Sequence, residues 1–339
     1  MHAVDEEELH AYRERRLPPA KQFRDGVWTV PLTLPGTSLT TSFAYLIVDD
    51  RGKGHLIDAG WALPANVTRI RAVLRAAGLN DGDLVQIVAT HLHPDHLGGA
   101  ELVRSFTGAS VTLLDQEERS RQAAHAEFGD RIARVEEQLR RWRVPADEKQ
   151  VLIQAAAEQT PPSAFPVDRL VVDGGHLAIG DGALEVIHTP GHTWGHICLA
   201  DHDRKLLFTG DHLLPTVLPA VGTGGPGEGN PLKAYLGSLS KLEQYDGYEV
   251  CPGHGYRFLG LSERIRGIER RHRTRSEQIA SLVRRDPDAS IWQIAERVEW
   301  SAGWKNVIGA HRLSALAQTE THLLAVTEQE PDRESKAPR

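Results

Sequence analysis

Four candidate metal ligands stand within six residues of the chain, in the sequence His-Leu-His-Pro-Asp-His at 91–96. They follow residues 84–89, whose length and valine and isoleucine content predict a buried strand. Because side chains on a strand alternate between its faces, His91 and His93 leave the chain on the same side. Pro94 and the glycines that follow predict a turn that carries Asp95 and His96. Imidazoles and a carboxylate that converge at a strand end suit a divalent metal ion.

Three further candidates stand in short glycine and proline turns. His192 lies in Thr-Pro-Gly-His-Thr, Asp211 in Thr-Gly-Asp and His254 in Pro-Gly-His-Gly. Each turn follows an apolar or strand-like segment, and loops at strand ends are where a rigid scaffold usually presents functional groups. A hydrogen-bonded structural histidine or a turn aspartate is the alternative for any one of them. Together with the motif at 91–96, four such sites occur in the same position after a strand-like segment. This shared placement favours one metal centre over four separate structural roles.

The motifs HxHxDH, TPGHT, TGD and PGHG, in this order, resemble those of the metallo-β-lactamase-fold hydrolases over about residues 25–260. The segment Leu-Ile-Asp-Ala-Gly at 56–60 is similar to the first strand–turn element of that family. The resemblance implies an α/β fold, a four-layer αββα sandwich with two metal ions at one edge of its sheets. It also implies the ligands: His91, His93 and His192 for the first metal ion, Asp95, His96 and His254 for the second, and Asp211 as a bridge between them.

The chemistry implied by this resemblance is hydrolysis. Two divalent cations about 3.5–4 Å apart lower the pKa of a shared water, so that a bridging hydroxide can attack a polarised carbonyl or phosphoryl group near neutral pH. Zinc is the expected metal, although nitrogen and oxygen donors also accept Mn²⁺ or Fe²⁺. Asp95 and Asp211 are the expected catalytic residues, and Asp95 would orient the nucleophile and pass a proton to the leaving group. Asp58, His188 and His196 are expected to orient the ligands, with turn capping as the alternative for Asp58.

The ligand set separates this chain from some relatives in the resembled family. Zinc β-lactamases of this fold lack the bridging aspartate and some use a cysteine ligand, whereas here Asp211 is present. Neither Cys198 nor Cys251 stands at a ligand position. The persulfide dioxygenases of the fold use a single iron and do not need the second set. β-Lactam hydrolysis is therefore not expected, and the two cysteines are predicted to be buried free thiols, which suits a reducing cytosol.

Composition is that of an ordinary globular protein, with 339 residues, 40% hydrophobic and 25% charged. The acidic start at 5–8 does not resemble a signal peptide. No apolar run approaches the roughly 20 residues of a membrane span, so a cytoplasmic location is expected. The pattern divides the chain into an N-terminal extension (1–24), a catalytic domain (25–260), a helical, winged-helix-like C-terminal domain (261–326) and a polar tail (327–339).

Two segments of the catalytic domain are candidates for the walls of the substrate pocket. Residues 116–128, 130–142 and 146–159 predict three helices within an insert at about 115–165. His125, Phe128 and Trp142 are candidate pocket residues there, with packing in a helical core as the favoured alternative. Residues 213–230 are rich in glycine and proline and begin just after Asp211. They are predicted to cover the substrate or to form a structural crossover, and the lack of basic residues argues against a phosphate-rich substrate at that wall.

The chain becomes basic after His254. Residues 257–285 contain nine arginines and three glutamates, a net charge of +6, whereas the first 255 residues contain 24 basic and 34 acidic side chains, a net charge of −10. Clustered arginines can neutralise phosphates of a nucleic acid. The favoured alternative is an exposed helix whose arginines pair with the acidic body. Two more helices, at 288–298 and 306–324, are similar to the winged-helix-like domain attached to some members of the resembled family, but no convincing β-wing follows.

Together these features predict a dinuclear metal-dependent hydrolase of a small acyl substrate, namely a thioester, ester or lactone. One alternative is an endoribonuclease or phosphodiesterase of the same fold, supported by the basic helix. The other is a non-catalytic metal-binding scaffold, which would normally have lost ligands. A small-molecule acyl substrate is the expected partner, nucleic acid is less favoured, no membrane association is expected, and a homodimer stays open.

Overall fold

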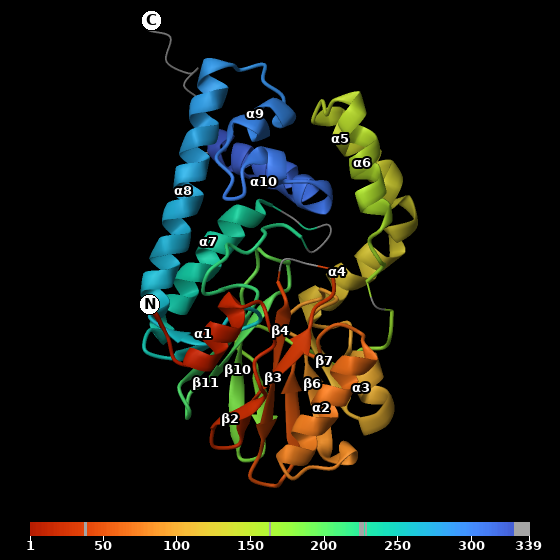
Figure 1. The fold of residues 1–339 in the computed structure, drawn as a ribbon, viewed down its shortest axis with the longest axis vertical. Helices are drawn as coiled ribbons and strands as arrows, with labels where there is room; N and C mark the ends of the chain where they lie inside the picture. Colours follow the sequence, from red (N-terminus) through yellow and green to blue (C-terminus); the bar gives the residue numbers. More distant parts are fainter. Residues whose placement is uncertain (37–38, 163, 224–226, 228, 329–339) are drawn as a thin grey trace, which may run out of the picture.

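The computed structural model describes residues 1–36, 39–162, 164–223, 227 and 229–328, and its core is two seven-stranded sheets that pack face to face (Figure 1). One sheet has the order β1 (His2–Ala3), β14 (Phe258–Leu259), β13 (Glu249–Pro252), β12 (Leu206–Gly210), β11 (Ile197–Asp201), β10 (Gly182–His188) and β9 (His176–Ile179). The other has the order β2 (Lys21–Arg24), β3 (Val27–Thr33), β4 (Thr41–Val48), β5 (Gly54–Ile57), β6 (Leu84–Val88), β7 (Ser110–Leu114) and β8 (Arg169–Val171).

Strand alternation divides the apolar side chains into three layers. On β11, Ile197 and Leu199 join the core between the sheets, whereas Cys198 and Ala200 face the opposite side. The strands of the second sheet alternate in the same way, so both sheets are buried on both faces. Both cysteines are buried free thiols, as predicted.

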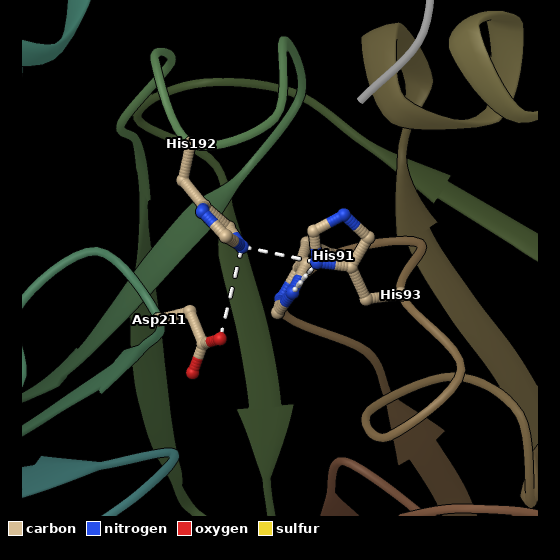
Figure 2. A group of neighbouring side chains, drawn as sticks. All are labelled: His91, His93, His192 and Asp211. Atoms are coloured by element: carbon tan, nitrogen blue, oxygen red, sulfur yellow. Dashed lines mark hydrogen bonds and ion pairs between the residues drawn. The ribbon is translucent and has the colours of Figure 1, made fainter. Parts of the chain in front are cut away.

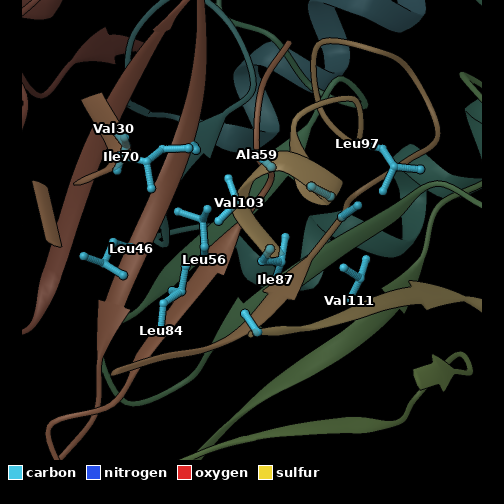
Figure 3. Packing of buried hydrophobic residues seen from close by; sticks show 14 of the residues in the cluster. Val30, Leu46, Leu56, Ala59, Ile70, Leu84, Ile87, Leu97, Val103 and Val111 are labelled. Carbon is cyan, nitrogen blue, oxygen red and sulfur yellow. The ribbon is translucent and has the colours of Figure 1, made fainter. Parts of the chain in front are cut away.

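Helices cover the two outer faces. Helices α2 (Pro64–Ala76) and α3 (Ala100–Thr107) pack on the second sheet through side chains such as Ile70 and Val103 (Figure 3). Helices α7 (Pro231–Leu242) and α8 (Leu261–Arg285) pack on the first sheet. The predicted four-layer αββα sandwich is therefore confirmed.

Parallel strand pairs bring chemically active loops to one edge of the sandwich. Strand β5 pairs parallel with β6, and β12 pairs parallel with β13. Because parallel strands end at the same edge of a sheet, the residues that follow β5 and β6 lie together, and so do those that follow β12 and β13. Those residues include Asp58, His91, Asp211 and His254.

The insert and the C-terminal tail form one helical lobe, although more than 100 residues separate them in sequence (Figure 1). The insert contains α4 (Asp115–Ala126), α5 (Arg131–Arg141) and α6 (Ala146–Ala157), and the tail contains α9 (Ile291–Arg297) and α10 (Gly309–Thr327) as well as α8. Trp142 and Leu152 of the insert share a buried core with Trp292 and Leu316 of the tail. All three predicted insert helices and the predicted C-terminal helices are confirmed. No strand forms in the described residues after 260, so the tail has no β-wing there.

The N-terminal segment contributes to both sheets. Residues 1–24, which are predicted as an N-terminal extension, add β1 to the edge of one sheet and β2 to the edge of the other. Helix α1 (Glu6–Arg13) is held by Arg257, whose Nε donates to Glu8 at 2.9 Å in a buried ion pair. None of the helices in the described part of the chain combines the length and apolar character that crossing a membrane requires.

Two buried histidines join α8 to α10. His272 Nδ1 lies 3.4 Å from His322 Nε2, and Ser276 Oγ lies 2.8 Å from His322 Nδ1. Burial lowers the pKa of His272 to about 4, and the charge of Arg275 adds to this shift. Burial likewise lowers the pKa of His322 to about 3, with His272 and Arg275 as further causes. Both rings are therefore neutral in the folded protein at neutral pH.

This pair predicts a loss of stability in acid. The unfolded chain protonates these histidines near pH 6.5 and the folded chain does so only near pH 4 or below, so the free energy of unfolding falls as the pH drops through that window. His272 alone should contribute a loss of about 2 kcal/mol between pH 7 and pH 5. Urea unfolding at both pH values should show a smaller loss for His272→Gln than for the unmodified protein. Equal losses in the two proteins would contradict the prediction.

Candidate metal centre

Four of the predicted ligands form a first group at the sheet edge (Figure 2). His93 Nδ1 lies 3.0 Å from His91 Nε2 and 3.0 Å from His192 Nε2. Asp211 Oδ2 lies 3.7 Å from His192 Nε2. One donor atom from each of the four residues lies within 4.8 Å of the others, which is close enough for all four to hold one metal ion.

The other three predicted ligands form a second group beside the first. One donor atom each of Asp95, His96 and His254 again lies within 4.8 Å of the others, and Asp95 Oδ2 is 3.2 Å from His254 Nε2. Asp211 Oδ1 lies 3.3 Å from both His96 Nε2 and His254 Nε2. The two oxygens of Asp211 therefore face the two groups, which is the position that a bridging carboxylate requires.

The electrostatics of these groups suit cations. His96 Nε2 and Asp211 Oδ1 are buried and have no hydrogen-bond partner among the described residues. Burial, together with the neighbouring His93, lowers the pKa of His192 to about 4, so its ring is a neutral donor at pH 7. Burial also lowers the pKa of His254, but Asp211 and Asp95 outweigh it and raise that pKa to about 10. The carboxylates thus attract positive charge, and divalent cations would supply it in place of protons. The residues present fit a dinuclear metal site.

Comparison with known proteins agrees with this geometry. A family profile described as the metallo-beta-lactamase superfamily matches residues 38–254. The chain belongs to this superfamily. A hydroxyacylglutathione hydrolase from Fuscovulum blasticum is 30% identical over 227 residues, or 66% of each chain, and one from Cereibacter sphaeroides is 30% identical over 220 residues, or 64% of each chain. The matches therefore span just under two thirds of the length of these relatives.

Two solved structures are similar over nearly the whole chain. A metallo-beta-lactamase family protein from Thermus thermophilus has a TM-score of 0.73 and 25% identity, with 91% of this chain and 95% of that chain covered. A beta-lactamase domain protein from Burkholderia ambifaria has a TM-score of 0.75 and 23% identity, with 94% and 91% covered. The second likeness concerns the fold alone.

Two of the three predicted supporting residues contact this metallo-beta-lactamase-type centre. Asp58, at a positive φ of 61°, accepts from His96 Nδ1 at 2.7 Å and from the backbone N–H of Thr90 at 2.7 Å. His196 is buried, and its Nε2 accepts from the backbone N–H of Asp211 at 3.2 Å. His188 instead contacts the Trp194 carbonyl at 2.8 Å, outside both groups of ligands.

Backbone carbonyls aim two of the histidine rings. His192 Nδ1 donates to the Ala220 carbonyl at 2.6 Å, and His254 Nδ1 donates to the Thr41 carbonyl at 2.7 Å. These bonds place the proton on Nδ1 and leave Nε2 free as a metal donor. The segment at 213–223 therefore contacts the centre directly, and it has no helix or strand, as its glycines and prolines predict. Residues 224–226 and 228 of the predicted loop lie outside the described residues.

Glu117 is a central residue that the sequence did not reveal. It lies in the first turn of α4, is fully buried, and accepts from the Leu92 N–H at 2.8 Å, the Thr193 hydroxyl at 2.6 Å and the Gly195 N–H at 2.7 Å. Burial raises the pKa of its carboxyl to about 7, although these three donors oppose the shift. Glu117 thus ties the loop that carries His93 to the loop that carries His192. An acidic residue in a helical first turn is too common to mark such a role.

A cavity of about 770 Å³ opens onto the centre. His93 and Leu92 form part of its floor, and Trp61 and Phe128 contribute aromatic walls. Phe128 is therefore a pocket residue as proposed from the sequence. Trp142 instead belongs to the core of the helical lobe, and the exposed His125 contacts the Pro162 carbonyl.

The position of Glu117 predicts a loss of metal affinity when it is changed. Glu117→Ala leaves three buried donors without an acceptor and frees the two loops from each other. We expect metal affinity at the group containing His93 and His192 to fall about 10- to 100-fold, as is usual for lost supporting contacts. Competition with a chelator, followed by metal analysis, would measure this. Glu101→Ala, on the exposed face of α3, is the control. Unchanged metal retention in folded Glu117→Ala protein would contradict the assigned role.

Proposed function

We propose that this protein is a dinuclear metal-dependent hydrolase that cleaves a small acyl substrate, and that the substrate is a thioester. The observation that carries the proposal is the pair of adjacent ligand groups with Asp211 between them. All seven ligand positions are occupied by donor residues, which argues against a non-catalytic scaffold. Zinc is the proposed metal because histidine nitrogen and carboxylate oxygen are its usual donors.

The chain's own residues divide the work of the reaction. Two divalent cations at this centre would lower the pKa of a water molecule to near neutrality and polarise the scissile carbonyl. Asp95 is the more accessible carboxylate, with 18% of its side chain exposed, and its oxygen faces the shared space beside His254. In the proposal it orients the attacking oxygen, takes up its proton and delivers that proton to the departing sulfur. Glu117 and Asp58 hold the ligand loops in place and do not touch the substrate.

Support for a thioester comes from the relatives and from the cavity. The two curated relatives described above are named hydroxyacylglutathione hydrolases, after a glutathione thioester. Trp61, Leu92 and Phe128 offer apolar surface next to His93, which suits an acyl chain. The cavity volume is within the range of small-ligand sites.

Removal of one bridging or one terminal ligand should abolish turnover. Asp211→Ala removes the carboxylate that faces both groups, and His93→Ala removes the imidazole between His91 and His192. We expect kcat/KM for an acyl thioester to fall at least 1,000-fold, or about 4 kcal/mol, while circular dichroism stays close to that of the unmodified protein. Turnover that persists in either variant at equal metal content would contradict the mechanism.

The substrate class is tested by a turnover screen of the zinc-loaded protein. One panel contains acyl thioesters, aryl esters and lactones, and the other contains bis(p-nitrophenyl) phosphate and single-stranded RNA. The proposal predicts activity on the first panel that the Asp211→Ala variant lacks. Activity confined to the phosphodiesters would replace it with a nuclease function.

The cavity predicts which residue sets affinity for the acyl group. Phe128→Ala removes an aromatic wall without changing any ligand, so KM for a long-chain acyl substrate should rise about 5- to 20-fold, with kcat within a factor of two. Loss of the apolar contact between the Phe128 ring and the acyl chain of the substrate costs about 1–2 kcal/mol of binding free energy. The control is Val151→Ala, an exposed position on α6 outside the cavity. Steady-state kinetics on short and long acyl chains would measure both, and an unchanged KM would contradict the prediction.

A further inference from the structure

A second groove of about 540 Å³ lies along the basic helix α8. Its walls include four arginines of that helix, Arg264, Arg270, Arg271 and Arg275. The opposite wall includes Leu218 from the loop that follows the metal centre, and Glu299 and Ser301 from the segment after α9. The groove shares no lining residue with the cavity at the metal centre.

The four arginines form no ion pair with any residue that the structure describes. Among the described residues, no carboxylate oxygen lies within 4.0 Å of any of their guanidinium nitrogens, and this includes Glu299 in the same groove. The prediction that these arginines pair with the acidic body is therefore wrong for this set. Burial lowers the pKa of Arg264 and of Arg275, and the nearby charge of Arg271 adds to both shifts. Like charges held together in this way cost stability, and such local conflicts are expected where a ligand binds.

Two of the guanidinium groups are fixed in place. Arg264 is buried, and it donates from Nε to the Leu214 carbonyl and from Nη2 to the Val217 carbonyl, both at 2.6 Å. Arg275 lies over the Trp300 ring at 4.5 Å and donates to Gln318 at 3.3 Å. These contacts keep the positive charges at the groove, because the side chains are not free to turn toward bulk water. A site with its charges already in place binds anions at a lower entropic cost.

We propose that this groove binds a small organic anion that carries two phosphate groups. Four guanidinium groups line the groove, and two linked phosphates offer enough oxygens to pair with several of them at once. Guanidinium groups bind phosphate through paired hydrogen bonds. Thr274, Gln278 and Ser301 also line the groove and offer hydroxyl and amide donors for the remaining phosphate oxygens.

Occupation of the groove would act on the loop over the metal centre. Arg264 holds the carbonyls of Leu214 and Val217, and the same loop supplies the Ala220 carbonyl that aims His192. An anion that neutralises the arginines would relieve the repulsion at Arg264 and strengthen its hold on the loop. The groove is therefore connected to the active site through this short backbone segment.

The test is calorimetric titration of the metal-loaded protein with ADP at low ionic strength, with thermal unfolding as a second readout. The double variant Arg270→Gln/Arg271→Gln removes two exposed charges of the groove, and we expect at least 10-fold weaker binding and loss of the thermal shift. Arg266→Gln is the matched control, an exposed arginine of α8 that does not line the groove. Since all three proteins have the same metal ligands, any binding of ADP at the metal centre is common to them. These readouts do not require turnover, so they are independent of the proposed hydrolase activity.

Further probes separate the sources of the phosphate. Adenosine should not bind, and higher salt should weaken ADP binding in the unmodified protein far more than in the double variant. If the phosphates belong to the substrate, ADP competes with an acyl thioester carried on a nucleotide phosphate but not with a truncated thioester. If the phosphates belong to a free effector, ADP changes the turnover of both thioesters, the nucleotide-linked one and the truncated one. Equal ADP affinity in the double variant and in Arg266→Gln would overturn the proposal, and so would binding of single-stranded RNA alone without ADP binding.

Discussion

The burial of the Asp211 carboxylate among histidines is the constraint on which the rest of the site depends. Its oxygens lie 3.3 Å from His96 and His254 and 3.7 Å from His192, and only 12% of its side chain is exposed. A buried anion requires positive charge close by. The pKa of His192 is lowered to about 4 and that of His254 is raised to about 10, so at neutral pH protons would place a positive charge on only one of these two histidines. Two divalent cations between the ligand groups would balance the charges that the fold has gathered.

A rigid scaffold is needed to hold such groups together against their desolvation cost. The sandwich supplies it because parallel pairs, β5 with β6 and β12 with β13, deliver their following loops to the same edge. Asp58 and Glu117 then connect those loops: Asp58 joins the end of β5 to Thr90 and His96, and Glu117 joins the histidine loops of both sheets. The ligand geometry is thus determined by hydrogen bonds between loops as well as by the strands.

The sequence predicted what depends on local pattern. Strand-like segments followed by histidine or aspartate turns predicted the seven residues that the structure gathers in two groups, and the family resemblance predicted the layered fold. It could not predict Glu117, because its three partners are 25 to 78 residues away and no local pattern marks them. The sequence also did not predict that Trp142 and Trp292 share one buried core. The apolar pattern of a helix shows which of its faces is buried but not which distant segment packs against that face. The predicted pairing of the basic segment with the acidic body is confirmed for Arg257 but is wrong for the four arginines of the groove, because composition gives the amount of charge and not its position.

The helical lobe has two roles that follow from how its parts are joined. The insert contributes Phe128 to the wall of the cavity at the metal centre, and the tail contributes α8, which runs beside the loop at 213–223. Because the two segments share one core, the cavity wall and the tail belong to one packed unit. Arg264 adds a direct connection from α8 to the backbone that orients His192. An anion bound at the unpaired arginines of α8 would therefore affect the orientation of His192 without entering the cavity. A solvated basic face would need neither the buried position of Arg264 nor its two backbone bonds.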